Sequence, residues 1–224
     1  MAELITGLTA EGVRANLLAV RGEIAQAAAA AGRDPAQVEI LAATKYVAAE
    51  EIGTLAQAGL ERVGENRVQD LIAKQEHAPS QLRWDFIGQL QSRKVRQLVG
   101  RVERIHSVAS ESALRELARH PAPAEAPLSV LLEVNVAGEA GKAGFSPAQL
   151  DEMLERCPVP VAGLMTMPPA TADPEGSRRW FAALRELAAA RGLRELSMGT
   201  TQDFTVAVQE GATIVRIGTR LYRC

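Results

Sequence analysis

The sequence predicts a single (β/α)8 barrel, a TIM barrel, in which a long amino-terminal helix completes the outer ring of helices. Short apolar runs rich in strand formers alternate with helical segments to give eight strands and seven helices, and strict alternation is typical of a parallel sheet. The last strand has no helix after it, whereas the first has a long helix before it that can fill the vacant place in the ring. No GxGxxG turn follows the first strand, which weighs against an open dinucleotide-binding sheet.

The first half of the chain supplies four of the expected strands. A helix is expected over 9–31, with Thr9 as a candidate N-cap, apolar residues at helical spacing and Gly32 at its end. The strands are expected over 38–45, 62–66, 84–88 and 104–109, and the helices after them over 48–59, 67–77, 90–100 and 110–120.

The second half repeats the pattern after PAPAEAP (121–127), the only linker-like stretch. We interpret that stretch as a surface loop, because the same alternation resumes after it. Strands are expected over 128–136, 161–167, 195–199 and 213–222, and helices over 146–157, 174–192 and 201–211. Ser146 followed by Pro147 is a typical helix start. Residues 1–224 are therefore expected to form one domain.

Composition limits the classes of function. The chain is 47% hydrophobic and 23% charged, which is ordinary globular composition. A net charge of −2 and 4% aromatic residues argue against a general nucleic-acid binder. No apolar run reaches the ~18 residues of a membrane span, and no signal peptide opens the chain. Two cysteines and three histidines are too few for a disulfide framework or a histidine metal cluster. We expect a cytoplasmic protein without a metal.

Lys45 is the first candidate site residue. Of the 25 basic residues only four are lysine, namely Lys45, Lys74, Lys94 and Lys142. Lys45 follows the apolar strand residues on the same face as Leu41 and Ala43. If that face is the barrel lumen, desolvation lowers the pKa of the ammonium and makes it a competent Schiff-base amine. The alternative is a lysine that reaches solvent at a strand end.

A second candidate site follows the last two strands. SMGTTQD (197–203) and RIGT (216–219) each place glycine at a strand end. Thr200 and Thr201 lead into a helix, so their hydroxyl groups and the backbone N–H groups can hold a phosphate. In the alternative interpretation, a threonine only caps the helix and Gly218 serves a turn. Arg216 is expected to point into the barrel and to pair with a carboxylate such as Glu133 or with a ligand.

Short motifs along nearly the whole chain resemble those of the pyridoxal phosphate homeostasis protein family. They are LAATK (41–45), GENRVQD (64–70), WDFIGQLQSRK (84–94), IHSV (105–108), LEVNVAGEAGKAGF (132–145), GLMTM (163–167), LSMGTTQDF (196–204) and VRIGT (215–219). The resemblance implies a barrel similar to the N-terminal domain of alanine racemase, without that enzyme's second β domain. It also implies pyridoxal 5′-phosphate, a form of vitamin B6, held as a Schiff base on Lys45.

The resemblance assigns the other site residues. Thr201, Gly218 and Thr219 would hold the phosphate, Arg216 would approach the pyridine nitrogen, and Asn66 would line the ring. The chain departs from the family at several of its positions. The family more often has serine and threonine where this chain has Thr44 and Tyr46, histidine where it has Asp85, and serine where it has Thr201. Thr201 keeps the hydroxyl.

The implied role is to buffer and deliver the cofactor, with no catalytic residues and with apo-enzymes that use pyridoxal phosphate as candidate recipients. An arginine at the ring nitrogen makes the ring a weak electron sink. The titratable residues expected inside the barrel are Tyr46, Asp85, His106 and Glu133, and none comes with the partner that marks a tuned base. A monomer is expected rather than a dimer. The alternatives are an amino-acid racemase with the same cofactor, and a Schiff-base aldolase that uses Lys45 directly.

Overall fold

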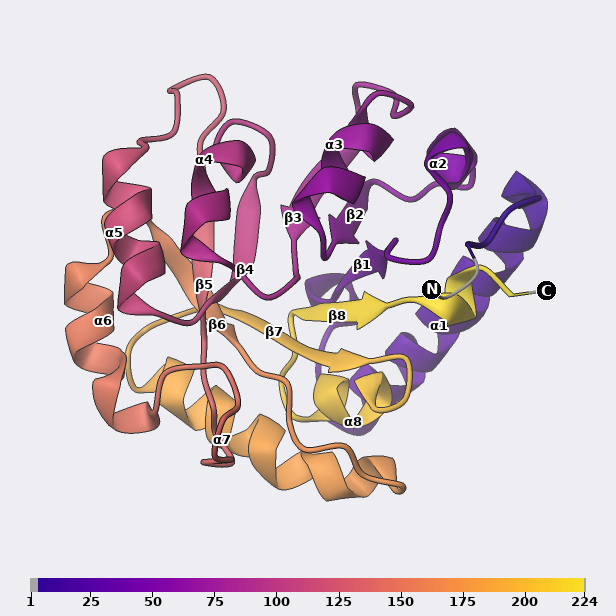
Figure 1. The fold of residues 1–224 in the computed structure, drawn as a ribbon. Helices are drawn as coiled ribbons and strands as arrows, with labels where there is room; N and C mark the ends of the chain where they lie inside the picture. Colours follow the sequence, from indigo (N-terminus) through magenta and orange to yellow (C-terminus); the bar gives the residue numbers. More distant parts are fainter. Residues whose placement is uncertain (1–3, 224) are drawn as a thin grey trace.

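The computed structural model describes residues 4–223 and shows a closed barrel of eight parallel strands surrounded by helices (Figure 1). Each strand pairs with its neighbour in the sequence, and β8 pairs with β1 to close the barrel. In this closing pair Leu41 lies opposite Arg216. The (β/α)8 barrel that the sequence predicts is therefore confirmed.

All eight predicted strands are present, and most are shorter than predicted. They are β1 Glu39–Ala43, β2 Arg62–Glu65, β3 Arg83–Phe86, β4 Arg104–Val108, β5 Ser129–Glu133, β6 Val161–Met165, β7 Glu195–Thr200 and β8 Ile214–Ile217. The last strand differs most from its expected range of 213–222. After Gly218 the chain turns into the 3₁₀ helix Thr219–Leu221, whose Leu221 is fully buried.

The helices cover the outside of the barrel. They are α1 Ala10–Ala30, α2 Ile52–Gln57, α3 Val68–Gln75, α4 Val95–Leu98, α5 Glu111–Arg119, α6 Leu150–Arg156, α7 Arg178–Ala189 and α8 Phe204–Gln209. Several begin later than predicted because a 3₁₀ turn takes up their first residues, as at Ser92–Lys94 and Pro147–Gln149.

The long α1 fills the gap in the outer ring, as the sequence predicts. Thr9 caps it, with its hydroxyl oxygen 3.1 Å from the amide nitrogen of Gly12. The helix packs against α2, α8 and the 3₁₀ helix after β8 (Figure 1). Asn16 donates hydrogen bonds to the carbonyl oxygens of Leu221 and Arg223. These bonds tie the first helix to the end of the last βα unit.

The barrel interior is divided between apolar and charged side chains. Four buried apolar residues form its small cluster, with Ile87 packed against them: Leu41, Leu131, Met165 and Ile214. At the amino ends of the strands the interior is ionic. The carboxylate of Asp85 is fully buried and pairs with Arg62 and Arg104. The larger apolar core lies between the strands and the helices.

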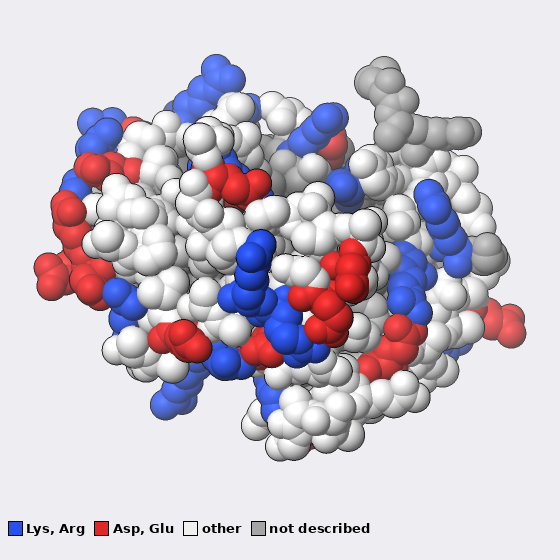
Figure 2. All heavy atoms as spheres, turned by 90° about the horizontal axis from the view of Figure 1, so that it is seen from below, with Lys and Arg blue, Asp and Glu red and all other residues white. Residues whose placement is uncertain are grey.

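The surface carries both signs of charge. Figure 2, which views the molecule from below the view of Figure 1, shows basic and acidic side chains intermixed on that face. Ion pairs from Arg178 and Arg185 to Glu210 connect α7 with the end of α8. Within residues 4–223, no helix has both the length and the apolar character that crossing a membrane requires.

Candidate functional site

One cavity at the carboxyl ends of the strands brings together all seven residues that the sequence predicts for cofactor binding. Its volume is about 430 Å³, within the usual range for small-molecule sites. The predicted residues on its wall are Lys45, Asn66, Thr200, Thr201, Arg216, Gly218 and Thr219. The wall also includes Ala43, Tyr46, Ile87, Met167 and Gln202. Of these five, Ile87 and Gln202 carry no chemical signal in the sequence beyond their place after a strand.

Lys45 lies at the mouth of the barrel. The strand β1 ends at Ala43, and the Lys45 side chain is exposed. Of the two interpretations left open for Lys45, the structure shows the lysine exposed at a strand end, because the chain leaves the strand two residues earlier than predicted. Its ammonium lies 4.6 Å from the centre of the Tyr46 ring, within reach of a cation–π interaction. A neighbouring cavity of about 390 Å³ shares Lys45, Tyr46 and Asn66.

A buried ion pair supports the backbone on both sides of Lys45 and Asn66. Lys74 donates to the Glu65 carboxylate and to the carbonyl oxygen of Thr44, the latter at 2.7 Å. Glu65 in turn accepts hydrogen bonds from the Asn66 amide at 2.6 Å and from the Thr44 hydroxyl at 3.0 Å. Glu65 and Lys74 are both buried. The loops after β1 and β2 therefore share one anchor, which sequence reasoning missed.

Gly88 lets the end of β3 approach Asn66 closely. A Cβ atom at position 88 would lie 1.9 Å from the carbonyl oxygen of Asn66, so any other residue would push the two loops apart. The buried hydroxyl of Ser107 donates to the carbonyl oxygen of Gly88 and holds this segment in place. The position of Asn66 thus depends on three consecutive strand ends.

The loops after β7 and β8 meet in the cavity. The Thr201 hydroxyl accepts a hydrogen bond from the Gly218 amide, with an N–O distance of 3.2 Å. The amides of Gln202 and Thr219 find no acceptor within residues 4–223. These features make a polar pocket suited to the oxygens of an anion.

Neither threonine caps α8, contrary to one interpretation of the sequence. The helix begins at Phe204, three residues later than predicted. Asp203 accepts hydrogen bonds from the amide and the hydroxyl of Thr200, at 2.8 and 3.1 Å. Gly199 has φ of +89°, and a Cβ atom there would meet Ala207 at 2.5 Å. Glycine therefore allows α8 to pack closely against the end of β7.

Arg216 points into the barrel, as predicted, and is 6% exposed. Its Nη1 donates to the Ser197 carbonyl at 2.8 Å and to the Ser197 hydroxyl at 2.6 Å. Its Nη2 donates to the carbonyl of Thr166 at 3.0 Å and contacts the Met167 sulfur at 2.9 Å. Burial lowers the pKa of Arg216 to about 10, and Glu133 and Asp203 oppose this shift. Of the two kinds of partner left open for Arg216, a carboxylate such as Glu133 or a ligand, Glu133 forms no ion pair with it.

Glu133 is buried beside this site and lies off the wall of the cavity. Burial raises the pKa of its carboxyl group, whereas the nearby charges of Arg216 and Lys142 lower it. Lys142 itself pairs with Glu139 in its own loop.

Asp85 and His106 are fully buried and also lie off the cavity wall. His106 lies between Asp85 and Ser197, with hydrogen-bond distances of 3.0 and 2.9 Å. The prediction that no titratable residue of the barrel has an orienting partner is thus wrong for His106. Sequence reasoning missed this arrangement because the partners are 21 and 91 residues away.

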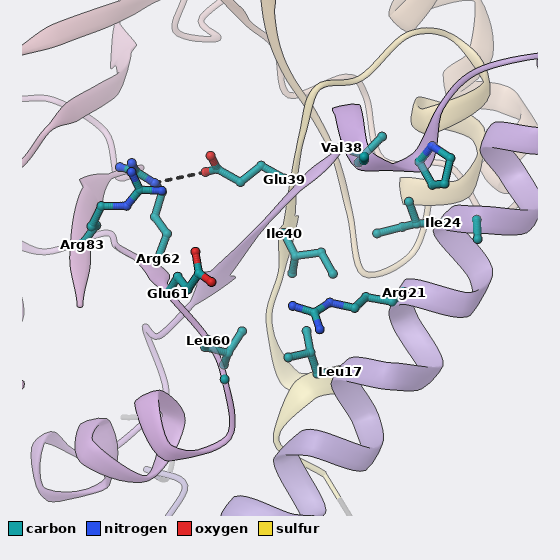
Figure 3. A pocket seen from close by; sticks show the side chains of 14 residues that line it. Leu17, Arg21, Ile24, Val38, Glu39, Ile40, Leu60, Glu61, Arg62 and Arg83 are labelled. Carbon is teal, nitrogen blue, oxygen red and sulfur yellow. Dashed lines mark ion pairs between the residues drawn. The ribbon is translucent and has the colours of Figure 1, made fainter. Parts of the chain in front are cut away.

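A hollow of about 460 Å³ lies at the opposite end of the barrel (Figure 3). The amino ends of β1 and β2 form one side, where Glu39 pairs with Arg62, and Leu17 and Arg21 of α1 form the other. Active sites of such barrels lie at the other face. Among the described residues, no group of three or more His, Cys, Asp or Glu side chains is placed to hold a metal ion.

The chain is similar to known proteins both in its sequence and in its fold. The family described as "Alanine racemase, N-terminal domain" matches residues 15–224. An Aquifex aeolicus protein named "Pyridoxal phosphate homeostasis protein" is 42% identical over 210 residues, 89% of this chain and 92% of that one. A Bifidobacterium adolescentis structure described as "an unknown protein" superposes with a TM-score of 0.85 and 34% identity, covering 99% of this chain and 98% of that one. PipY of Synechococcus elongatus PCC7942, with PLP bound, gives a TM-score of 0.79 and 31% identity, covering 94% and 100%.

Proposed function

Because the chain belongs to the pyridoxal phosphate homeostasis protein family, within the alanine racemase N-terminal domain fold, we propose that it binds pyridoxal 5′-phosphate at the mouth of its barrel. Its role is to buffer this cofactor and deliver it to other enzymes. One observation carries the proposal: the seven residues predicted for the cofactor line a single cavity of about 430 Å³.

The chemistry of the cavity wall fits this ligand. Lys45 and Arg216 supply positive charge, and no carboxylate lies among the twelve residues of the wall. The open amides of Gln202 and Thr219, with the hydroxyl of Thr201, suit a phosphate group. A dianionic phosphate is favoured where donors converge and carboxylates are absent.

Lys45 is the residue that would hold the cofactor covalently. Pyridoxal phosphate supplies an aldehyde, with which a primary amine condenses to a Schiff base. Lys45 carries the only primary amine among the residues on the cavity wall. Its exposure leaves the amine free to exchange the aldehyde with other amines, which suits a carrier better than a closed catalytic site.

Arg216 would serve the ring nitrogen. Arginine donates hydrogen bonds and accepts none. Four of its N–H groups are directed at protein acceptors, and the Nε–H finds none within residues 4–223. A donor at this place leaves the ring unprotonated, which weakens its capacity to stabilise a carbanion. Arg216 thus supports binding more than amino-acid turnover.

Transfer of the cofactor tests the proposed role. Protein loaded with pyridoxal phosphate and freed of unbound cofactor is mixed with the apo form of an aminotransferase that requires it. We expect activity to return as the cofactor leaves the carrier, with loaded Lys45→Ala protein as the matched control. A wild-type protein that takes up no pyridoxal phosphate, or that never releases it, would contradict the proposal.

A further inference from the structure

A line of four buried polar side chains runs through the barrel interior to the cavity. It comprises Asp85 of β3, His106 of β4, Ser197 of β7 and Arg216 of β8. The distances along the line are 3.0 Å from Asp85 Oδ2 to His106 Nε2, 2.9 Å from His106 Nδ1 to Ser197 Oγ, and 2.6 Å from Ser197 Oγ to Arg216 Nη1. Only Arg216 lies on the cavity wall.

The hydrogen bonds along this line can run in one direction only. Arg216 has donors and no acceptor, so the Ser197 oxygen accepts from it. The Ser197 oxygen has two lone pairs, so the direction of its bond to His106 is set at the other end of the line. The Asp85 carboxylate only accepts, so His106 carries its proton on Nε2 and donates it there, and the Nδ1 atom of the neutral imidazole accepts the Ser197 proton. Burial lowers the pKa of His106, with Asp85 opposing the shift, which agrees with a neutral imidazole in this tautomer.

Asp85, at the end of the line away from the cavity, is held by two arginine side chains. Arg62 Nη1 lies 2.6 Å from one oxygen of Asp85, and Arg104 Nε lies 2.9 Å from the other. Burial by itself would raise the pKa of Asp85, but His106, Arg104 and Arg62 together lower it. Asp85 is thus a charged and immobile acceptor, and the rest of the line is built from it.

The order Ser–His–Asp resembles that of a nucleophilic triad, but the surroundings do not fit one. Ser197 is fully buried, and its oxygen accepts a hydrogen bond from Arg216. A nucleophile needs an open path to its substrate. The line can instead hold the Arg216 guanidinium in place. A buried arginine that lacks fixed acceptors costs free energy, so its side chain moves toward other acceptors.

We propose that His106 and Ser197 are positioning residues, anchored on Asp85, that set the place of the Arg216 guanidinium for the bound cofactor. This inference rests on the proposed function. Its test uses spectra, because a guanidinium that shifts at the ring nitrogen changes the absorption of the ring, whereas a general loss of stability does not.

The experiment compares His106→Leu, which removes both hydrogen bonds, with His106→Asn, which keeps an acceptor near Ser197. Leu131→Ala is the matched control, since Leu131 is an interior residue outside the line. Each protein is titrated with pyridoxal phosphate, and its free energy of unfolding is measured without cofactor. We expect His106→Leu to weaken binding of pyridoxal phosphate about ten-fold and to move the absorption maximum of the bound cofactor. His106→Asn should have an affinity and an absorption maximum closer to those of the wild type.

Failure of the two proposals can be told apart. If wild-type protein binds no pyridoxal phosphate, the proposed function fails. If wild type binds it and His106→Leu has the same spectrum and affinity, the positioning role is wrong. An equal spectral shift in Leu131→Ala would also overturn it. If His106→Leu does not fold, Ser197→Ala replaces it, with the same expected shift and the same contradicting result.

Discussion

The hydroxyl of Thr201 accepts a hydrogen bond from the backbone amide of Gly218, with an N–O distance of 3.2 Å. This contact joins the loop after β7 to the loop after β8 at the cavity that also holds Lys45. The two loops are 17 residues apart in the sequence, and the pairing of β7 with β8 brings them together. The proposed phosphate pocket therefore depends on the β7–β8 pairing.

Replacing Thr201 by alanine should weaken binding of pyridoxal phosphate without unfolding the protein. The substitution removes one hydroxyl donor to a charged group, which costs about 1.5–3 kcal/mol, or roughly ten- to a hundred-fold in affinity. Equilibrium titration of cofactor-free protein measures the effect, and Thr201→Ser is the matched control because it keeps the hydroxyl. Equal affinities of wild type and Thr201→Ala would remove Thr201 from the phosphate pocket.

Replacing Lys74 by methionine should destabilise the protein strongly. The Glu65 carboxylate would then remain buried without its counter-charge, a change that typically costs about 3–5 kcal/mol. Urea unfolding measures the loss. Lys94→Met is the control, since Lys94 forms no ion pair within residues 4–223. If the two variants are equally stable, the Glu65–Lys74 pair does not anchor the loops that carry Lys45 and Asn66.

The strand order and closure could be predicted because they follow from strict alternation, from eight strands in succession, and from a long first helix that fills the place left after the last strand. Where the structure departs from prediction, local packing decides. The sequence predicts that the apolar residues after Gly218 continue the last strand, but Leu221 and Tyr222 are buried as part of a turn against α1. In the same way, the pattern predicts that residues 201–203 belong to the last helix, but the helix begins at Phe204. The Asp203 carboxylate instead accepts a hydrogen bond within the loop, from the amide of Thr200.

The candidate site also has a part that the sequence predicts and a part that it does not. Lys45, Asn66 and the glycine- and threonine-rich strand ends lie in short motifs, and their meeting in one cavity follows from the barrel. The line from Asp85 through His106 to Ser197 has no spacing rule, since its members come from three strands and meet only when the barrel closes. The burial of Glu65 against Lys74 was hidden for the same reason.

The contribution of His106 to the stability of the protein should fall as the pH drops below about 6.5. Burial holds the pKa of His106 below its ordinary value, so below about pH 6.5 the unfolded state binds a proton that the folded state does not. Stability from this group is complete above that pH and is lost as the pH falls toward the folded-state pKa, by up to about 1.4 kcal/mol per pH unit.

Urea unfolding at a series of pH values between 5 and 8 measures this slope. The slope in His106→Asn should be smaller by about one proton. Asp85, whose pKa is also lowered, acts only below its ordinary value of about 3.9, so its contribution is not mixed with that of His106. A slope that is unchanged in the variant would show that His106 is not held neutral in the folded protein.

Loaded protein should exchange the α-proton of amino acids far more slowly than an enzyme does. Apart from Lys45 and Arg216, Tyr46 is the only titratable residue on the wall of the cavity, and no carboxylate or imidazole there can act as a tuned base. Exchange of several L- and D-amino acids in deuterated water measures this. Turnover of roughly 1–10³ per second would favour the racemase alternative instead.

The central claim, that this barrel carries pyridoxal phosphate on Lys45, is tested most directly by borohydride trapping. The loaded protein is reduced, digested and mapped by mass spectrometry, and Lys45→Ala protein is treated in parallel. The account predicts one cofactor label per chain on Lys45 in the wild type and loss of that label in the variant. A label on Lys74, Lys94 or Lys142 in place of Lys45, or a reducible cofactor retained by the variant, would contradict it.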